Sequence, residues 1–344
     1  MRILVRRRLT ENETAIDAMR GFAAILVLLS HADAYGLIPI VFTTHAKIIT
    51  GETGVDLFFM LSGYLIWVSA ERTLPKPGGL WTYFIHRATR IAPLYYVALA
   101  LVLFAAPLFV GSFHPSTTMS GVVRRHIFFA QSIAPPVSDQ INPVLWTLTH
   151  EAIYYALVPI LWFARRRPLW LLLPASIAIS VLAWHVWLGA LTLFLRVAFM
   201  FAIGFTIARY EIGASWVLAA VGAVACVLIR NQSPFLVSPV LAFTCLMLFS
   251  KVTVAWPLKP FAWAGVISYS LYIWNYILVE WVGPALIYTD PVTRAAIFII
   301  VVFGFSSLTY FVIERPSMTV LRRFLVRHRP PLPSSLAVWG RAER

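Results

Sequence analysis

The sequence predicts an all-α integral membrane protein that crosses the bilayer about ten times. Of its 344 residues, 60% are hydrophobic and only 12% are charged, whereas about 25% of the residues in an average soluble domain are charged. The mean hydropathy is +0.79. Apolar runs long enough to cross a hydrocarbon core of about 30 Å recur along the chain. We therefore predict one transmembrane domain over residues 1–316, followed by a basic, proline-containing cytoplasmic tail over residues 317–344.

Ten apolar runs are candidate transmembrane helices. In chain order they cover residues 16–38, 53–70, 91–111, 144–163, 169–188, 191–209, 214–230, 235–250, 261–282 and 293–313. Basic residues set the orientation of these helices, because Lys and Arg are enriched in cytoplasmic loops. With the N-terminus in the cytoplasm, the inner segments hold 21 of the 28 Lys and Arg residues. This distribution predicts an even number of helices and places both termini in the cytoplasm.

The net charge of +14 follows from this topology and does not indicate nucleic-acid binding. A nucleic-acid-binding protein concentrates its basic residues on a soluble face, whereas here they lie between apolar runs. Both cysteines, Cys226 and Cys245, lie inside apolar runs, with neither a disulfide framework nor the spacing of metal ligands. We expect no nucleic-acid partner and no bound metal.

The longest outer connection covers about residues 112–143 and contains Arg124, Arg125 and His126. Its basic and apolar residues could form an interfacial helix over residues 121–133. Connections of this length are often functional lids.

The first apolar run contains an arginine and a histidine eleven residues apart. At about 100° per residue, eleven residues complete three helical turns to within about 20°, so Arg20 and His31 share one face, about 16 Å apart. Ionisable groups in a bilayer are costly and usually face a cavity or each other. Arg20 falls near the inner surface, and His31 falls past the midplane. Asp17, three residues before Arg20, is placed to form an ion pair with it.

His31 is a candidate general base. Histidine titrates near neutral pH, and burial favours the neutral imidazole, which can accept a proton. The alternative is a histidine that only forms a hydrogen bond between helices.

A second basic group, Arg87 and Arg90, lies at the expected cytoplasmic start of the third helix. Residues three positions apart share a helix face, and arginine binds phosphate through two parallel hydrogen bonds. Ordinary positive-inside flanking charge accounts equally well for the pair.

Carboxylates within the spans need partners. Glu151 could orient His31 or receive its proton, or it could instead pair with Arg196 in the sixth span. Asp56 and Glu280 lie toward the outer ends of their spans, where either could bind a polar substrate or cap a helix.

Small residues in the second span have a different expected role. Gly54, Ser62 and Gly63 are typical of close helix packing.

Several sequence blocks together resemble the membrane-bound acyltransferase 3 family, over most of residues 15–316. The blocks are IDAMRGFAAILVLLSH, GVDLFFMLSGYLI, RATRIAPLYY, WTLTHEAIYY, SYSLYIWNYILV and FVIERPSM. The resemblance is closest to exopolysaccharide and O-antigen acetyltransferases. The residues that match family positions are Asp17, Arg20, His31, Arg87, Arg90, Pro93, Tyr95, Trp146, Glu151 and Tyr155.

The resemblance implies transfer of an acyl group, usually acetyl from cytoplasmic acetyl-CoA, to a hydroxyl of a glycan at or beyond the outer face. It also implies the inner membrane of a bacterium and an exported or lipid-linked saccharide as acceptor. The chain departs from the family at Asn275, where histidine is common. Asparagine cannot carry a proton at neutral pH, so an acid–base role must fall to His31.

The expected site follows from this resemblance. Donor-binding residues would be Arg20, Arg87, Arg90 and Asp17; catalytic residues would be His31, Glu151 and Tyr155; substrate-binding residues would be Asp56, Trp146 and Asn275. His31 would either deprotonate the acceptor hydroxyl or briefly take the acyl group itself. The alternatives from other classes are a transporter or flippase of lipid-linked sugars and a non-catalytic scaffold.

Overall fold

A computed structural model describes residues 2–38, 51–109, 119–133, 141–212, 224, 239–240, 242–244 and 259–328. Within these ranges the chain forms helices and no strand, which confirms the predicted all-α class. The helices are α1 (Arg2–Ala34), α3 (Gly51–Thr73), α4 (Gly79–Phe109), α5 (Met119–Ile127), α6 (Trp146–Phe163), α7 (Leu172–His185), α8 (Thr192–Arg209), α11 (Lys259–Val266), α12 (Ser268–Leu286), α13 (Pro291–Thr309) and α14 (Arg322–Arg327). The predicted spans 214–230 and 235–250, with both cysteines, lie largely outside the described residues.

Six helical segments are long and apolar enough to cross a membrane. They are Thr14–Ala34, Gly51–Thr73, Gly79–Phe104, Pro143–Phe163, Thr192–Arg209 and Pro291–Arg327. A seventh candidate is formed by α11 and α12, which meet at 79°. The predicted span 169–188 corresponds to a shorter apolar helix, Leu169–His185. The protein is therefore a multi-pass membrane protein, with six or seven candidate spans in the described part of the chain against ten predicted.

Two helices extend beyond their predicted ends. Helix α4 begins twelve residues before the predicted start at residue 91, directly after Gly78, whose positive φ of 70° ends the preceding turn. The last helix continues past Pro316 to Arg327, so the predicted domain boundary at residue 316 is not a break in the helix. π-Helical turns over Tyr310–Glu314 and Ser317–Leu321 accommodate the proline, which cannot donate a backbone hydrogen bond.

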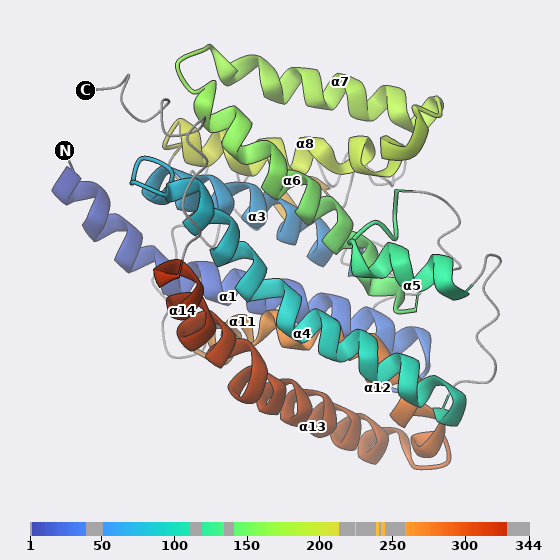
Figure 1. Cartoon of the computed structure of the whole chain (residues 1–344). Helices are drawn as coiled ribbons and strands as arrows, with labels where there is room; N and C mark the ends of the chain where they lie inside the picture. The colour runs from blue at the N-terminus through green and yellow to red at the C-terminus, as the bar shows by residue number, and fades with distance from the viewer. Residues whose placement is uncertain are drawn as a thin grey trace.

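The helices pack around α1, α3 and α12. Helix α1 contacts α3, α11 and α12; α3 packs on α8, α8 on α7, and α12 on α13. The buried core lies between α1, α3, α4, α6, α8 and α12. The start of α1, the α3–α4 turn and α14 lie at one end of the bundle, and α5 lies toward the other end (Figure 1).

Glycines allow backbones to approach closely at these contacts. A Cβ atom on Gly265 of α11 would overlap the carbonyl of Asp17 in α1, and one on Gly63 would overlap the carbonyl of Phe201. Gly54 faces the carbonyl of Ala23 in the same way. The predicted packing role of the α3 glycines is therefore confirmed.

Helix α5 overlaps the first half of the predicted interfacial helix over residues 121–133, but it begins earlier, at Met119, and ends earlier, at Ile127. His126 is 1% exposed. Its Nδ1 lies 2.9 Å from the carbonyl oxygen of Val122, and its Nε2 accepts a hydrogen bond from the Ile141 amide at 3.3 Å. Burial lowers the pKa of His126, which keeps the ring neutral and able to accept that bond. The histidine thus connects α5 to the segment that leads into α6.

Candidate active site

A cavity of about 630 Å³ lies between α1, α3, α4, α6 and α12, with α14 at its edge. This volume lies within the range of roughly 300–1,000 Å³ that small-molecule sites occupy. Two carboxylates line it, Asp17 and Glu151, but six basic side chains do so: Arg20, Arg72, Lys76, Arg87, Arg90 and Arg322. The excess of positive charge favours a ligand that carries several phosphate groups.

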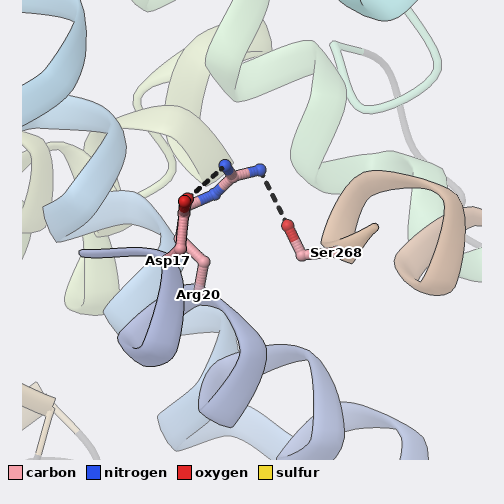
Figure 2. Close-up of polar contacts among 3 residues, drawn as sticks. All are labelled: Asp17, Arg20 and Ser268. Atoms are coloured by element: carbon pink, nitrogen blue, oxygen red, sulfur yellow. Dashed lines mark hydrogen bonds and ion pairs between the residues drawn. The ribbon is translucent and has the colours of Figure 1, made fainter. Parts of the chain in front are cut away.

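Two contacts hold the Arg20 guanidinium, one from its own helix α1 and one from α12. Its Nη1 is 3.6 Å from Oδ1 of Asp17, and its Nη2 donates a hydrogen bond to Oγ of Ser268 at 2.7 Å (Figure 2). The predicted ion pair between Asp17 and Arg20 is thus confirmed. Ser268 is fully buried and begins α12, directly after the 79° bend. The bend therefore places a hydroxyl where it fixes the guanidinium against the cavity.

Arg87 and Arg90 both line the cavity, one helical turn apart on α4. Nη2 of Arg87 donates a hydrogen bond to Oγ of Ser69 at 2.5 Å, and its guanidinium carbon lies 5.7 Å from the centre of the Tyr155 ring. Nε of Arg87 is buried with no hydrogen-bond partner among the described residues. An unpaired buried donor is unfavourable, and an anionic ligand would satisfy it.

Sequence reasoning missed three basic residues and one histidine of the cavity. It counts Arg72 and Lys76 only among the cytoplasmic basic residues, gives His86 no role, and places Arg322 in the tail beyond the domain. The extension of the last helix places Arg322 against α4, where its Nε lies 3.5 Å from Oγ1 of Thr89. In the sequence, a basic residue that lines a cavity looks the same as one that only flanks a membrane span. Only the packing of α14 on α4 shows that Arg322 belongs to the cavity.

Glu151 faces the cavity with partners that differ from those expected. Oε1 of Glu151 accepts hydrogen bonds from the Tyr155 hydroxyl at 2.6 Å and from the Ser62 hydroxyl at 3.3 Å. Ser62, expected only to allow packing, therefore has a polar role. Nε of Arg196 donates instead to the carbonyl of Ala183. Among the described residues no hydrogen bond joins Glu151 to either His31 or Arg196, so Tyr155 contacts the carboxylate rather than the imidazole.

Tyr272 and Thr147 both line the cavity and contact each other through their hydroxyls. Their hydroxyls are 2.9 Å apart, and the Tyr272 hydroxyl also donates to the carbonyl of Val144 at 3.0 Å. His31 does not line the cavity. Asn275 links the predicted base to Tyr272 in the cavity lining, because its Oδ1 contacts His31 and its Nδ2 donates to the carbonyl of Tyr272.

His31 is paired with Asn275, 244 residues away in the sequence. Its Nδ1 lies 2.6 Å from Oδ1 of Asn275, whose Nδ2 donates to the carbonyls of Leu271 and Tyr272. These two bonds fix the orientation of the amide, so Oδ1 accepts a hydrogen bond from the Nδ1–H of His31. In the neutral imidazole this leaves Nε2 unprotonated, the form that a general base or nucleophile requires.

Three residues that were expected to bind substrate do not line the cavity. Asn275 is fully buried, and its amide oxygen contacts Nδ1 of His31. Asp56 is 8% exposed within α3. Trp146 packs edge-on against the rings of Phe59 and His150, with centroid distances of 5.9 and 5.2 Å.

One face of α12 connects the cavity to His31. Ser268, Tyr272, Asn275 and Tyr276 follow one another at the i, i+4, i+7 and i+8 positions of a single helical face. Ser268 contacts Arg20, Tyr272 lines the cavity, Asn275 contacts Nδ1 of His31, and Tyr276 packs edge-on against the His31 ring at 5.3 Å. Helix α12 therefore runs parallel to the Arg20–His31 face of α1 and supplies partners for both residues.

The family model of acyltransferase 3, described as an acyltransferase domain, matches residues 13–311. The chain belongs to the acyltransferase 3 family. All the residues of the cavity except Arg322 lie within this match, as do His31 and Asn275.

Two relatives agree with this membership of the acyltransferase 3 family. The exopolysaccharide production protein ExoZ of Rhizobium meliloti is 34% identical over 109 residues, which cover 31% of this chain and 32% of ExoZ. ORF330 of Acidianus two-tailed virus, which is named as an acetyltransferase, is 29% identical over 146 residues, covering 42% of this chain and 40% of ORF330. The alignments thus span less than half of either relative. No solved structure matches the chain.

Proposed function

We propose that the protein transfers an acetyl group from acetyl-CoA to a hydroxyl of an exported glycan. The observation that carries this proposal is the arrangement of an arginine-lined cavity and an oriented histidine along one α1–α12 interface. Membership of the acyltransferase 3 family supports the reaction class. The name of ExoZ supports a polysaccharide as acceptor.

The donor would bind with its phosphates among Arg20, Arg87 and Arg90. Arginine side chains match phosphate oxygens in geometry and charge, and the buried Nε of Arg87 lacks a protein partner among the described residues. The pantetheine arm would extend along α1 and α12 toward Tyr272 and Thr147. Separation of those two hydroxyls would bring the thioester to His31.

His31 would act through its unprotonated Nε2. This nitrogen takes the proton from the acceptor hydroxyl while the hydroxyl oxygen attacks the thioester carbonyl. The carbon–sulfur bond breaks, and the CoA thiolate leaves with the proton that the imidazolium returns. Asn275 holds Nδ1 throughout, as the third member of a catalytic triad does for its base. The alternative route, an acyl-imidazole formed on the same nitrogen, also requires the unprotonated Nε2.

The proposal includes a topology of ten spans with both termini in the cytoplasm of a bacterium, and the chain in the inner membrane. Cytoplasmic loops are rich in Lys and Arg. The end of α3, the α3–α4 turn and α14, which carry the lining residues Arg72, Lys76 and Arg322, lie at the end of the bundle where α1 begins (Figure 1). Cytoplasmic acetyl-CoA would therefore reach the cavity directly.

A labelling experiment tests the proposal. Membranes that contain the protein are incubated with acetyl-labelled acetyl-CoA and an oligosaccharide acceptor, and the glycan is analysed by mass spectrometry. We expect an increase of one acetyl unit per acceptor with the wild type and none with His31→Ala. Movement of saccharide across the membrane without label transfer would instead indicate a transporter.

A further inference from the structure

A compact polar group surrounds His31 on the side away from the cavity. Helix α1 contributes His31, and Tyr35 follows the end of α1 directly, with its amide donating to the carbonyl of His31 at 3.3 Å. Helix α12 contributes Tyr276 and Glu280, which are four residues apart and therefore on one helical face. The Tyr35 and Tyr276 hydroxyls are 2.9 Å apart, and both phenols interact with the Glu280 carboxylate. Tyr35 is 44% exposed, and the other three side chains are partly exposed. We call these residues the outer tyrosine cluster.

The geometry of the outer tyrosine cluster differs from that of a membrane-interface belt. Belt tyrosines place single rings among lipid headgroups. Here the Tyr276 ring packs edge-on against both His31 and Tyr35, at 5.3 and 6.0 Å between ring centres. The rings thus form a wall beside the imidazole, with a carboxylate at its edge.

Arg294 of α13 fixes this wall in place. Its Nη1 donates to the carbonyl of Gly36, directly after Tyr35, at 2.8 Å. Its Nη2 donates to the carbonyls of Ile287 and Thr289 at 3.0 and 2.8 Å. The end of α1 is therefore held against the α12–α13 turn, and Tyr35 has a defined position relative to His31.

The chemistry of the outer tyrosine cluster suits a carbohydrate. Aromatic rings offer apolar faces to the C–H surfaces of a sugar, while phenols donate and accept hydrogen bonds. An ionised carboxylate accepts hydrogen bonds from hydroxyl groups. A carboxylate within a membrane-spanning segment is itself a functional-site candidate.

We propose that Tyr35, Tyr276 and Glu280 form the acceptor site, which holds one sugar hydroxyl beside His31. This assignment rests on the proposed function, because it names the surface that binds the glycan in that reaction. Glu280 and the two phenols bind the hydroxyls next to the reacting one. The acceptor thus enters from the side of His31 opposite to the donor cavity.

Steady-state kinetics of Glu280→Gln and Tyr35→Phe test the acceptor site. Both variants keep the shape of the side chain and remove a charge or a hydroxyl. We expect the KM for an oligosaccharide acceptor to rise about tenfold or more, the effect of losing one hydrogen bond to a charged group. The Kd for acetyl-CoA, measured by calorimetry in detergent, should stay at the wild-type value. Tyr288→Phe is the matched control, since Tyr288 is 95% exposed in the nearby α12–α13 turn.

The outcomes separate this inference from the proposed function. Unchanged acceptor KM in both variants, with normal transfer by the wild type, would overturn the acceptor site and leave the reaction standing. An equal rise in the acceptor KM of Tyr288→Phe would also overturn it. No transfer by the wild type to any saccharide would overturn both proposals.

Discussion

At the scale of single residues, the orientation of His31 is the feature on which the proposed chemistry depends. The sequence identifies His31 and predicts the Asp17–Arg20 pair, because both follow from spacing along one helix. It does not predict that Asn275 orients the imidazole, since that contact joins residues 244 positions apart. It offers either His31 or Arg196 as the partner of Glu151, whereas the carboxylate accepts hydrogen bonds from Tyr155 and from Ser62 of α3. Local spacing predicts contacts within a helix, and contacts between helices need the tertiary structure.

The first prediction concerns Asn275. Replacement Asn275→Ala removes the acceptor that holds Nδ1 of His31, so the imidazole can rotate and change tautomer. We expect kcat to fall about 10- to 100-fold, as is typical for loss of a group that orients a catalytic or metal-binding histidine. The affinity for acetyl-CoA, measured by calorimetry, should not change because Asn275 does not line the cavity. A kcat of Asn275→Ala equal to that of the wild type would contradict the positioning role of Asn275.

At the scale of elements, the ends of helices are where sequence reasoning was least accurate. The predicted start of the third span at residue 91 excluded the charged stretch before it, but α4 begins at Gly79 and carries those charges inside the helix. The same reasoning ended the last helix near Pro316, although it runs to Arg327. In both places charged residues face the cavity or its edge, where a polar environment accommodates them. Hydropathy alone does not distinguish such residues from flanking loops.

The second prediction concerns the contact between α1 and α11. Gly265→Ala would place a Cβ atom on the backbone carbonyl of Asp17, and the helices would have to separate. We expect a loss of about 1–3 kcal/mol in stability, which is the usual effect of overpacking. Thermal unfolding in detergent measures it. Gly304→Ala is the control, because no atom lies within 4 Å of the added methyl. Equal stability of the two variants would contradict the close packing.

The third prediction concerns pH and α5. Burial lowers the pKa of His126 below its ordinary value, so the unfolded segment binds more protons than the folded one. Stability therefore decreases as pH falls through the unfolded pKa of about 6.5. Protonation also ends the hydrogen bond that Nε2 accepts from the Ile141 amide.

Hydrogen exchange followed by mass spectrometry checks this behaviour. After correction for intrinsic rates, the amides of residues 141, 142, 144 and 145 should lose protection between pH 7.5 and pH 5.5. The variant His126→Gln, which does not titrate, should show no such change. Equal pH dependence in both proteins would contradict the role of His126.

At the scale of the whole molecule, composition correctly predicts the all-α class and the multi-pass character, and the count of ten spans stays a prediction. Six segments of the described residues are candidate spans, while the predicted span 169–188 is short, 261–282 is bent by 79°, and 214–230 and 235–250 lie largely outside the described residues. The bend separates α11 from α12 and presents Ser268 to Arg20. Periodic hydropathy does not reveal such a bend, which depends on the packing of α11 against α1.

The fourth prediction concerns topology. In a background in which Cys226 and Cys245 are replaced by alanine, Lys76→Cys should react with a membrane-impermeant thiol reagent only from the cytoplasmic side. Tyr288→Cys, in the turn between α12 and α13, should react only from the outer side. Both positions are exposed, so access of the reagent is not limited by packing. Labelling of both cysteines from the same side would contradict the proposed orientation.

The central claim is that two residues of α1 have different roles: Arg20 binds the donor, and His31 carries out the chemistry. Acetyl-CoA binding to two purified variants tests this claim most directly. Arg20 lines the cavity and His31 does not. We therefore predict that Arg20→Ala raises the Kd for acetyl-CoA about tenfold or more, the effect of losing one charge-assisted contact. His31→Ala should keep the wild-type Kd and transfer no acetyl group. Wild-type affinity in Arg20→Ala, or normal transfer by His31→Ala, would contradict the account.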